Sequence, residues 1–386
     1  MSKRRPRLLY LHNRAPGESL ANQVQVLEMC RALQEAGFDI TLALPKGRLS
    51  QEEAREAVAI ELGEPVKFQI EFWNRGPGWL VSSSARSYFG LKRANIAWRE
   101  YDYVFVRFVP FLGLAIRSGA KVVFESHAVR IFTRFDLLNR LARGAFVRLT
   151  RKERLTLFIS VSHALRDHWV RKGVPAEKSV ALHDGVRDSE ITRPGDRIPS
   201  RESLGLPTSG RIATYSGSLG ADRHPGRLIQ LARDLPDVTI CVVGGTLEQL
   251  KKISGDSDTF PTNLRAVGRV PHSRVSDYLA VSDALLMLWS WDVPTIYFCS
   301  PLKMFEYMAV GKPIVGEAFP TITEVLTDGE NGYLVEPANY IALRDGLTRA
   351  LSDGVEHTVG IRAVQDVGAY TWERRAEAIY QNLEGR

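Results

Sequence analysis

The chain has 386 residues, and its 25% charged and 44% hydrophobic residues are typical of a folded globular protein rather than a disordered or fibrous one. This length exceeds what one ordinary hydrophobic core holds and predicts two domains of similar size. Cys30, Cys241 and Cys299 are far apart and form no C-x-x-C pair, which argues against a disulfide framework or a zinc site and fits a reducing compartment.

The most apolar stretches are too short to insert into a membrane. Residues 8–11 follow a basic N-terminus and end at His12, so they predict a first strand and not the core of a signal peptide. Residues 108–116 lie between Arg107 and Arg117 and fall short of the roughly 20 apolar residues that a bilayer requires. We therefore expect a cytoplasmic location.

The net charge of +7 is unevenly distributed along the chain. Residues 1–195 carry 32 Lys and Arg against 20 Asp and Glu, a net charge of +12, whereas residues 196–386 carry 19 against 24, a net charge of −5. A basic half favours an anionic partner, such as a membrane leaflet, a lipid pyrophosphate, an acidic glycan or a nucleic acid.

In chain order, the first half alternates short apolar runs with amphipathic helices, the pattern of a parallel sheet covered on both faces. A helix over residues 22–36 ends at Gly37, a segment at 193–200 predicts a linker, and the second half repeats the alternation. Strands are expected at 8–11, 38–44, 103–106, 121–124, 157–160, 212–215, 239–243, 264–267, 284–288, 313–315 and 333–335. The fold class is therefore α/β, with two Rossmann-like, doubly wound domains at 1–192 and 205–368 that face a cleft.

A phosphate and ribose site is predicted at residues 300–315, which run S-P-L-K-M-F-E-Y-M-A-V-G-K-P-I-V. The segment predicts a turn, a helix, a glycine stop and a buried strand. The first helical turn exposes backbone N–H groups and the positive end of the helix dipole, which attract a diphosphate. Glu306, one turn deeper, is placed to accept hydrogen bonds from ribose hydroxyls. The alternative is a helix cap with a solvated glutamate.

This segment is followed by P-T-I-T-E-V-L at 320–326, expected to form a helix, and by D-G-E-N-G-Y-L-V at 328–335. Together these motifs resemble the donor-binding half of the retaining glycosyltransferases of family 4 (glycosyl transferases group 1), which have the GT-B fold. The resemblance implies that the last helix, within residues 369–386, crosses back and packs on the N-terminal domain.

Residues 215–223, Y-S-G-S-L-G-A-D-R, predict a strand that ends in a glycine-containing loop. Glycine lets backbone amides approach a phosphate, and an arginine supplies a charged fork. The loop resembles the family's Y-x-G-x-L-x-x-x-R/K, which implies that Gly217, Ser218 and Arg223 bind the donor diphosphate. A solvated surface arginine is the alternative, and the second basic residue of many relatives has only Arg227 as a counterpart.

The chain departs from the family pattern at the phosphate-binding helix. Pro301 and Leu302 stand where the family commonly has Gly-Leu, so one amide donor is missing, and Lys303 is expected to compensate. Relatives often carry two glutamates separated by seven residues. Glu306 matches the second, on ribose, but Phe298 occupies the position of the first, so the donor sugar stays open.

The same resemblance implies further site residues. His127, in F-E-S-H after a predicted strand, matches a strand-then-histidine element that approaches the donor sugar, with Glu125 on the acceptor side. Asn22, in A-N-Q-V-Q-V-L-E-M-C, resembles a helix start at the cleft, which implies an acceptor-binding residue where Gly17 permits close approach. A structural histidine and an ordinary cap at Asn22 are the alternatives. Val270, in G-R-V, is implied to meet the nucleobase through backbone groups.

Residues 134–154 predict a basic amphipathic helix. Leu138, Leu141, Ala145 and Leu149 share one stripe, and four arginines share another. A solvated face and reversible docking on the inner face of the plasma membrane both stay open, the second because each basic side chain near an anionic leaflet contributes about 1 kcal/mol.

We therefore predict a retaining glycosyltransferase that moves a sugar from a UDP- or GDP-sugar to a lipid-linked or surface-glycan acceptor of the cell envelope. The resemblance implies a front-face mechanism in which Arg223, Lys303 and helix amides stabilise the leaving diphosphate, with His127 near the reacting carbon. No metal or other cofactor is expected, because the D-S-D at 256–258 lies in a polar loop and no H-E-x-x-H occurs. Basic residues without an interleaved aromatic platform argue against nucleic acid.

Two other functions stay open. A nucleotide-sugar epimerase shares the two-domain architecture and would convert a donor without an acceptor. A catalytically degenerate subunit that only binds nucleotide sugars is favoured by Phe298 and Pro301.

Overall fold

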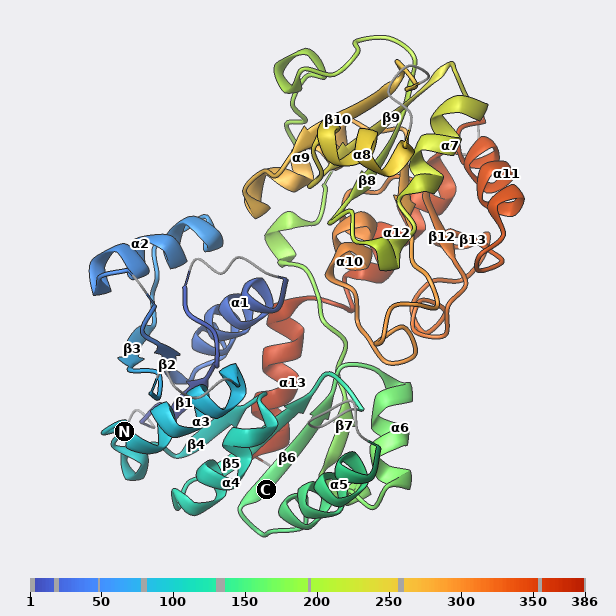
Figure 1. Cartoon of the computed structure of the whole chain (residues 1–386). Coiled ribbons are helices and arrows are strands. Elements are labelled where there is room, and N and C mark those ends of the chain that lie inside the picture. Colours follow the sequence, from blue (N-terminus) through green and yellow to red (C-terminus); the bar gives the residue numbers. More distant parts are fainter. Residues whose placement is uncertain are drawn as a thin grey trace. The chain divides into compact units, whose positions relative to one another are not determined.

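The computed structural model describes residues 4–16, 21–47, 49–77, 82–129, 136–193, 196–255, 260–352 and 356–384. Gly17 and residues 256–258, considered above, lie outside these ranges. The chain divides into two compact units, an N-terminal unit of Met1–His183 with Trp372–Arg386 and a C-terminal unit of Asp184–Thr371 (Figure 1). Each unit is described by itself below.

The N-terminal unit is built on a seven-stranded parallel sheet with the order β3-β2-β1-β4-β5-β6-β7. Its strands are β1 (Arg7–Leu11), β2 (Asp39–Pro45), β3 (Gln69–Trp73), β4 (Tyr103–Val106), β5 (Lys121–Ser126), β6 (Leu155–Ser160) and β7 (Ser179–Ala181). The central strands are the expected apolar runs. The two edge strands, β3 and β7, were not predicted from the sequence, because both are only partly buried and lack a continuous apolar run.

Helices cover both faces of this sheet (Figure 1). They are α1 (Ala21–Glu35), α2 (Gln51–Leu62), α3 (Ser83–Arg93), α4 (Val109–Arg117), α5 (Asp136–Thr150), α6 (His163–Arg171) and the C-terminal α13 (Trp372–Glu384). As expected, the last helix returns to this unit: α13 packs against α1, and Arg31 donates to Glu373 at 2.6 Å. Because α1 begins at Ala21, Asn22 lies inside the helix and is not its cap.

The C-terminal unit has a six-stranded parallel sheet with the order β10-β9-β8-β11-β12-β13. Its strands are β8 (Arg211–Ser216), β9 (Val238–Val243), β10 (Leu264–Gly268), β11 (Ala284–Met287), β12 (Ile314–Glu317) and β13 (Tyr333–Val335). Its helices are α7 (Gly226–Asp234), α8 (Leu247–Ser254), α9 (Val275–Ala280), α10 (Leu302–Ala309), α11 (Tyr340–Ala350) and α12 (Glu356–Val367). Side chains of β11 alternate between two cores: Leu285 and Met287 pack with α10, whereas Leu286 packs with α7 and α11.

Two local expectations differ from the structure. Residues 320–325 form consecutive turns and not the expected helix. Residues 184–192 pack within the C-terminal unit, where the Thr192 N–H donates to Ala309 O at 2.9 Å and Val186 pairs with Thr371. The unit boundary therefore precedes the Pro- and Gly-containing segment at 193–200, which gave the stronger local signal.

The apolar stripe predicted on the basic helix is wrong. Leu141 is 67% exposed and Ala145 is exposed, whereas the buried face of α5 carries Phe146 and Val147. Phe146 packs edge-on to Phe124 with ring centroids 5.2 Å apart, because these aromatic rings fill the space between α5 and the sheet. The side chain of Leu138 lies outside the described residues. Membrane docking by this helix stays a prediction.

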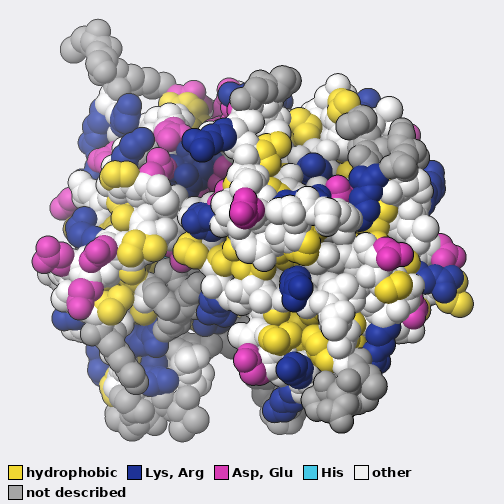
Figure 2. Space-filling model, turned by 90° about the horizontal axis from the view of Figure 1, so that it is seen from above, with side chains coloured by type: hydrophobic (Ala, Val, Ile, Leu, Met, Phe, Trp, Pro, Cys, Tyr) yellow, Lys and Arg dark blue, Asp and Glu magenta, His cyan; other side chains and the backbone are white. Residues whose placement is uncertain are grey.

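None of the helices in the described part of the chain has the length and apolar character that crossing a bilayer takes. On the face seen in Figure 2, Lys and Arg side chains are interspersed with Asp and Glu, and hydrophobic side chains form small separate groups.

Candidate functional site

Two strand ends of the C-terminal unit meet through glycines. Gly217 follows β8 with φ +134, and its N–H donates to Val243 O, at the end of β9, at 2.8 Å. A Cβ on Gly244 would lie 2.7 Å from Gly217 O, so this close approach requires glycine. The exposed Ser218 follows, and its carbonyl accepts a hydrogen bond from Tyr215 Oη at 2.9 Å. This bond holds the start of the loop that leads to Arg223.

Lys303 reaches this loop from the first turn of α10. Its Nζ donates to Ser216 O at 2.7 Å and lies 4.4 Å from the centre of the Tyr215 ring. Burial, and then the charge of Arg223, lower the pKa of Lys303 to about 7, against a smaller opposing effect of Glu306. An anion that binds close to this buried ammonium group would strongly stabilise its charged form.

Arg223 lies over an indole ring. Its guanidinium carbon is 4.0 Å from the centre of the Trp289 ring, and Lys303 Nζ is 5.8 Å from the same ring centre. The Nη1 atom of Arg223 is buried and has no hydrogen-bond partner among the described residues. We call Arg223 and Lys303 the cation pair. Sequence reasoning missed Trp289, which follows β11 outside any motif.

Arg227 has a different role. It pairs with Glu317 at 2.7 Å, and it also donates to Trp289 O at 2.6 Å. The same carboxylate accepts from the Trp289 N–H at 3.0 Å and the Ala338 N–H at 2.8 Å. Arg227 and Glu317 therefore hold the backbone of Trp289 in place.

The remaining predicted donor residues lie around α10 or near the end of β10. Pro301 is the residue before the helix, with ψ 121, and it makes no side-chain cap; Leu302 is the first helical residue. Glu306 is partly buried, and its carboxylate lies 3.6 Å from His272 Nε2. The side chain of Val270 packs against a small core with Ile212 and Cys241.

In the N-terminal unit, Glu125 is the second-last residue of β5, and its side chain is completely buried. Its carboxylate is 3.0 Å from Arg107 Nε, 2.6 Å from His127 Nε2 and 2.9 Å from Arg375 Nη1. We call these four residues the carboxylate cluster. Burial alone would raise the pKa of Glu125, but Arg375, His127 and Arg107 together hold it below its usual range.

The carboxylate cluster differs from the expected acceptor site. Glu125 is enclosed by its partners, so its geometry suits positioning and not direct acceptor contact. Asn22 supplies its carbonyl to Arg107 Nη1 at 3.1 Å, and its own side-chain oxygen is buried. Burial, and then the charge of Arg107, lower the pKa of His127 to about 4, so this imidazole is neutral near pH 7.

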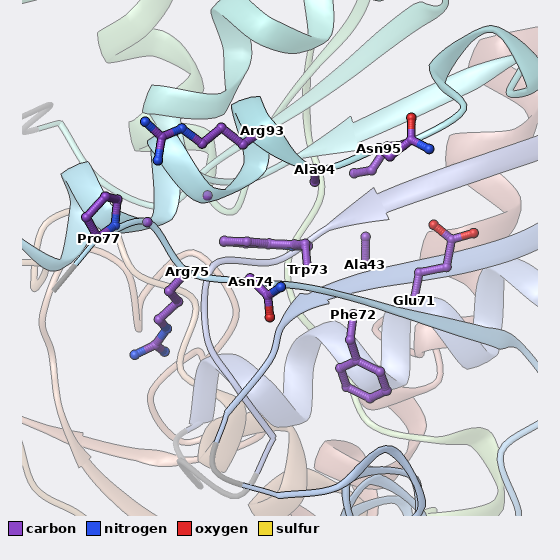
Figure 3. Close-up of a pocket in the computed structure, with 13 residues that line it drawn as sticks. Ala43, Glu71, Phe72, Trp73, Asn74, Arg75, Pro77, Arg93, Ala94 and Asn95 are labelled. Carbon is purple, nitrogen blue, oxygen red and sulfur yellow. The ribbon is translucent and has the colours of Figure 1, made fainter.

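A separate pocket of about 620 Å³ lies in the N-terminal unit, between the end of β3 and the residues after α3 (Figure 3). The Trp73 side chain lies at its centre, with Arg75 and Arg93 on one side and Glu71 and Asn95 on the other. Gly90 lets α3 approach the end of β3, since a Cβ there would lie 2.8 Å from the Trp73 ring.

Within the described residues, no group of three or more His, Cys, Asp or Glu side chains is arranged to hold a metal ion. The cation pair beside the Trp289 ring concentrates positive charge near the start of α10, and the pocket beside Trp73 has charged and polar side chains at its rim.

Comparison with known families identifies both halves of the chain. Residues 196–363 match the family model described as Glycosyl transferases group 1, and residues 23–190 match the model described as Glycosyltransferase Family 4. Among curated proteins, the D-inositol 3-phosphate glycosyltransferase of Mycobacterium leprae is 27% identical over 217 residues, 54% of this chain and 49% of the relative. The enzyme of the same name from Mycobacterium marinum is 26% identical over 54% of this chain and 45% of its own length. The chain thus matches about half the length of these relatives.

Solved structures share the fold over nearly the whole chain. Sucrose-phosphate synthase from Thermosynechococcus elongatus has a TM-score of 0.75 at 17% identity, covering 99% of both chains. HepE from Anabaena, solved with UDP-glucose, has a TM-score of 0.72 at 17% identity, covering 98% of this chain and 100% of its own. The two parallel sheets, one per unit, are those of the GT-B fold.

Proposed function

We propose that this chain, which belongs to the group 1 and family 4 glycosyltransferases, transfers a sugar from a UDP-sugar to a hydroxyl group of a glycan or lipid-linked acceptor, with retention of configuration. The observation that carries the proposal is the cation pair around Trp289, in which a buried guanidinium nitrogen has no partner in the described part of the chain. A buried donor of this kind favours binding of an anion.

The donor diphosphate would lie against the cation pair. Arg223 offers a guanidinium whose carbon is 4.0 Å from the Trp289 ring centre, and Lys303 offers an ammonium held by Ser216 O. The backbone amides at the start of α10 add fixed dipoles. Glu306 would accept hydrogen bonds from the ribose hydroxyls, as its place one turn into the helix allows. We propose a UDP-sugar as the donor because HepE, which shares the fold, was solved with UDP-glucose.

The chemistry would proceed on one face of the donor sugar. The bond between the sugar C1 and the leaving phosphate oxygen breaks, and the acceptor hydroxyl oxygen bonds to C1 from the same side. The acceptor proton passes to the leaving diphosphate, so no protein nucleophile is consumed. Charge gathers on the diphosphate in the transition state, and the prearranged cation pair stabilises it there.

The acceptor would use the pocket beside Trp73. Glu71 and Asn95 suit the hydroxyl groups of a sugar ring, and Arg75 and Arg93 suit an anionic substituent. The curated relatives are named for D-inositol 3-phosphate, a polyol with an anionic group, which fits the same chemistry.

Calorimetric titration with UDP, GDP and a panel of their sugars tests the donor site, followed by product analysis with and without glycan acceptors. We expect saturable binding of UDP-sugars and transfer only when an acceptor is present. Absence of binding to every nucleotide at millimolar concentration would refute the proposal. An isomerised donor formed without acceptor would instead identify an epimerase.

A further inference from the structure

We propose that Glu125 fixes the ring proton of His127 on Nε2, so that Nδ1 acts as a hydrogen-bond acceptor for a sugar hydroxyl, and that Arg375 is the positioning residue that holds Glu125 in this role. The sugar-binding part rests on the proposed function; the proton position does not.

The carboxylate determines where the proton lies. Glu125 Oε1 is 2.6 Å from His127 Nε2, a distance that requires a hydrogen between them. Two arginines contact the same buried carboxylate, at 3.0 Å and 2.9 Å, so it is ionised and can only accept. The proton must therefore belong to Nε2. The other tautomer would place two lone pairs 2.6 Å apart.

Arg107 does not reverse this assignment. Its Nε and Nη2 lie 3.0 Å and 2.8 Å from His127 Nε2, and both would donate to that atom if it were bare. The guanidinium has other acceptors, however: Glu125 Oε1, the Asn22 carbonyl at 3.1 Å and Gln25 Oε1. A neutral imidazole has one proton, and only the tautomer with Nε2–H satisfies the carboxylate, which is the charged partner.

The opposite edge of the imidazole is available to a ligand. The side chain of His127 is 30% exposed, and within the described residues all its hydrogen bonds involve Nε2. The lowered pKa of about 4 keeps the ring neutral near pH 7, so Nδ1 carries a lone pair and no proton. Such an atom accepts a hydrogen bond from a hydroxyl group and repels another acceptor.

Arg375 acts through Glu125. It comes from α13, and its Nη1 lies 2.9 Å from Glu125 Oε2. Its Nε donates to His183 O at 2.8 Å and its Nη2 to Leu182 O at 3.1 Å, so the side chain is anchored on both sides. The last helix of the chain thereby fixes the carboxylate, and through it the histidine.

Long-range ¹H–¹⁵N spectra of ¹⁵N-histidine-labelled protein at pH 7.5 test the proton position, with His127 assigned by its loss in a variant. We expect a protonated Nε2 and a bare Nδ1 in the wild type. In Glu125→Gln and Arg375→Gln, we expect a mixture of tautomers, with Arg375→Lys closer to the wild type. A wild-type His127 protonated on Nδ1 would overturn the proposal, whether or not the protein transfers sugar.

A matched pair of substitutions tests the hydroxyl contact. In His127→Asn the amide occupies the place of Nδ1 and keeps an acceptor there, whereas in His127→Gln it occupies the place of Nε2. We expect His127→Asn to retain at least tenfold more kcat/KM than His127→Gln, at equal thermal stability. Equal loss in both, or better retention by His127→Gln, would overturn the role of Nδ1. If the wild type transfers no sugar, the proposed function fails while the spectra still decide the tautomer.

Discussion

The two units hold their buried cations in opposite ways. In the N-terminal unit, Arg107 and Arg375 both contact the buried carboxylate of Glu125, so each guanidinium has an anionic partner within the protein. In the C-terminal unit, Arg223 and Lys303 lie beside aromatic rings and backbone carbonyls, and a nitrogen of Arg223 has no partner in the described ranges.

This difference separates a structural role from a binding role. A cation neutralised by a buried carboxylate has little further attraction for a ligand, but it fixes the groups that it touches. A cation held over an indole has no anionic partner there and keeps most of its attraction for an anion. Binding of an anion therefore stabilises the site. We therefore expect changes in the carboxylate cluster to alter stability first and changes in the cation pair to alter activity first.

The largest expected effect is on folding. Glu125→Ala leaves Arg107 and Arg375 buried without their carboxylate, so the free energy of unfolding should fall by about 3–5 kcal/mol. Denaturant titration measures this loss. The exposed Glu153 provides the control, and Glu153→Ala should change stability by less than about 0.5 kcal/mol. Equal stability of Glu125→Ala and the wild type would contradict the role given to the cluster.

The second effect is on catalysis. Arg223→Ala should lower kcat/KM roughly a hundredfold, about 3 kcal/mol, because one preorganised donor to the leaving diphosphate is lost. Its unfolding free energy should change little, since the one carboxylate that pairs with Arg223 among the described residues is that of Asp222, at 3.9 Å. Arg265, exposed on β10, is the matched control, and Arg265→Ala should retain activity. Activity of Arg223→Ala within threefold of the wild type would remove it from the site.

The sequence offered candidates for the donor side of this comparison, and their donor-binding role stays a prediction. Arg223, Lys303 and Glu306 lie in short motifs, where a glycine loop or a helix start makes their role readable. Trp289 lies in no such motif, because its position beside the cation pair arises only where the end of β11 meets the loop after β8. The central strands were predicted for a similar reason, since continuous burial leaves an apolar run.

The carboxylate cluster could not be predicted from short segments of the sequence. Arg375 lies 250 residues from Glu125, and no pattern at that separation marks the pair. Arg107 offered a signal, because it follows β4 and the carboxyl ends of neighbouring parallel strands meet at one edge of the sheet, where Glu125 and His127 also lie. Glu125 was assigned to the acceptor because its burial cannot be read from the residue type.

The third effect is a pH dependence that belongs to the cation pair. The pKa of Lys303 is lowered to about 7, so its ammonium form is complete only below that value. A donor diphosphate binds the ammonium form, and donor affinity should therefore fall as the pH rises through 7, by up to about tenfold per pH unit. Calorimetry with a UDP-sugar between pH 6 and 9 measures this.

Lys303→Arg is the control for this titration, because a guanidinium stays charged across the whole range. Its donor affinity should be nearly independent of pH. A pH dependence that persists in Lys303→Arg would assign the titration to another group.

The smallest expected effect concerns the pocket beside Trp73. Arg75→Glu and Arg93→Glu each reverse one exposed charge at its rim. For an acceptor with a phosphate or carboxylate group, each should raise the acceptor KM by about fivefold, or about 1 kcal/mol, with kcat and the donor KM unchanged. Initial rates at saturating donor measure the change.

Lys92 is exposed on α3, beside Arg93, but it does not line the pocket. Lys92→Glu is therefore the control that distinguishes a local contact from an effect of the unit's overall charge. If all three variants weaken an anionic acceptor equally, the basic surface attracts it at long range and the pocket has no special role. If only Arg75→Glu and Arg93→Glu do so, and a neutral acceptor is unaffected, the anionic group binds at this rim. The N-terminal unit would then carry two kinds of arginine: buried ones that position, and exposed ones that bind.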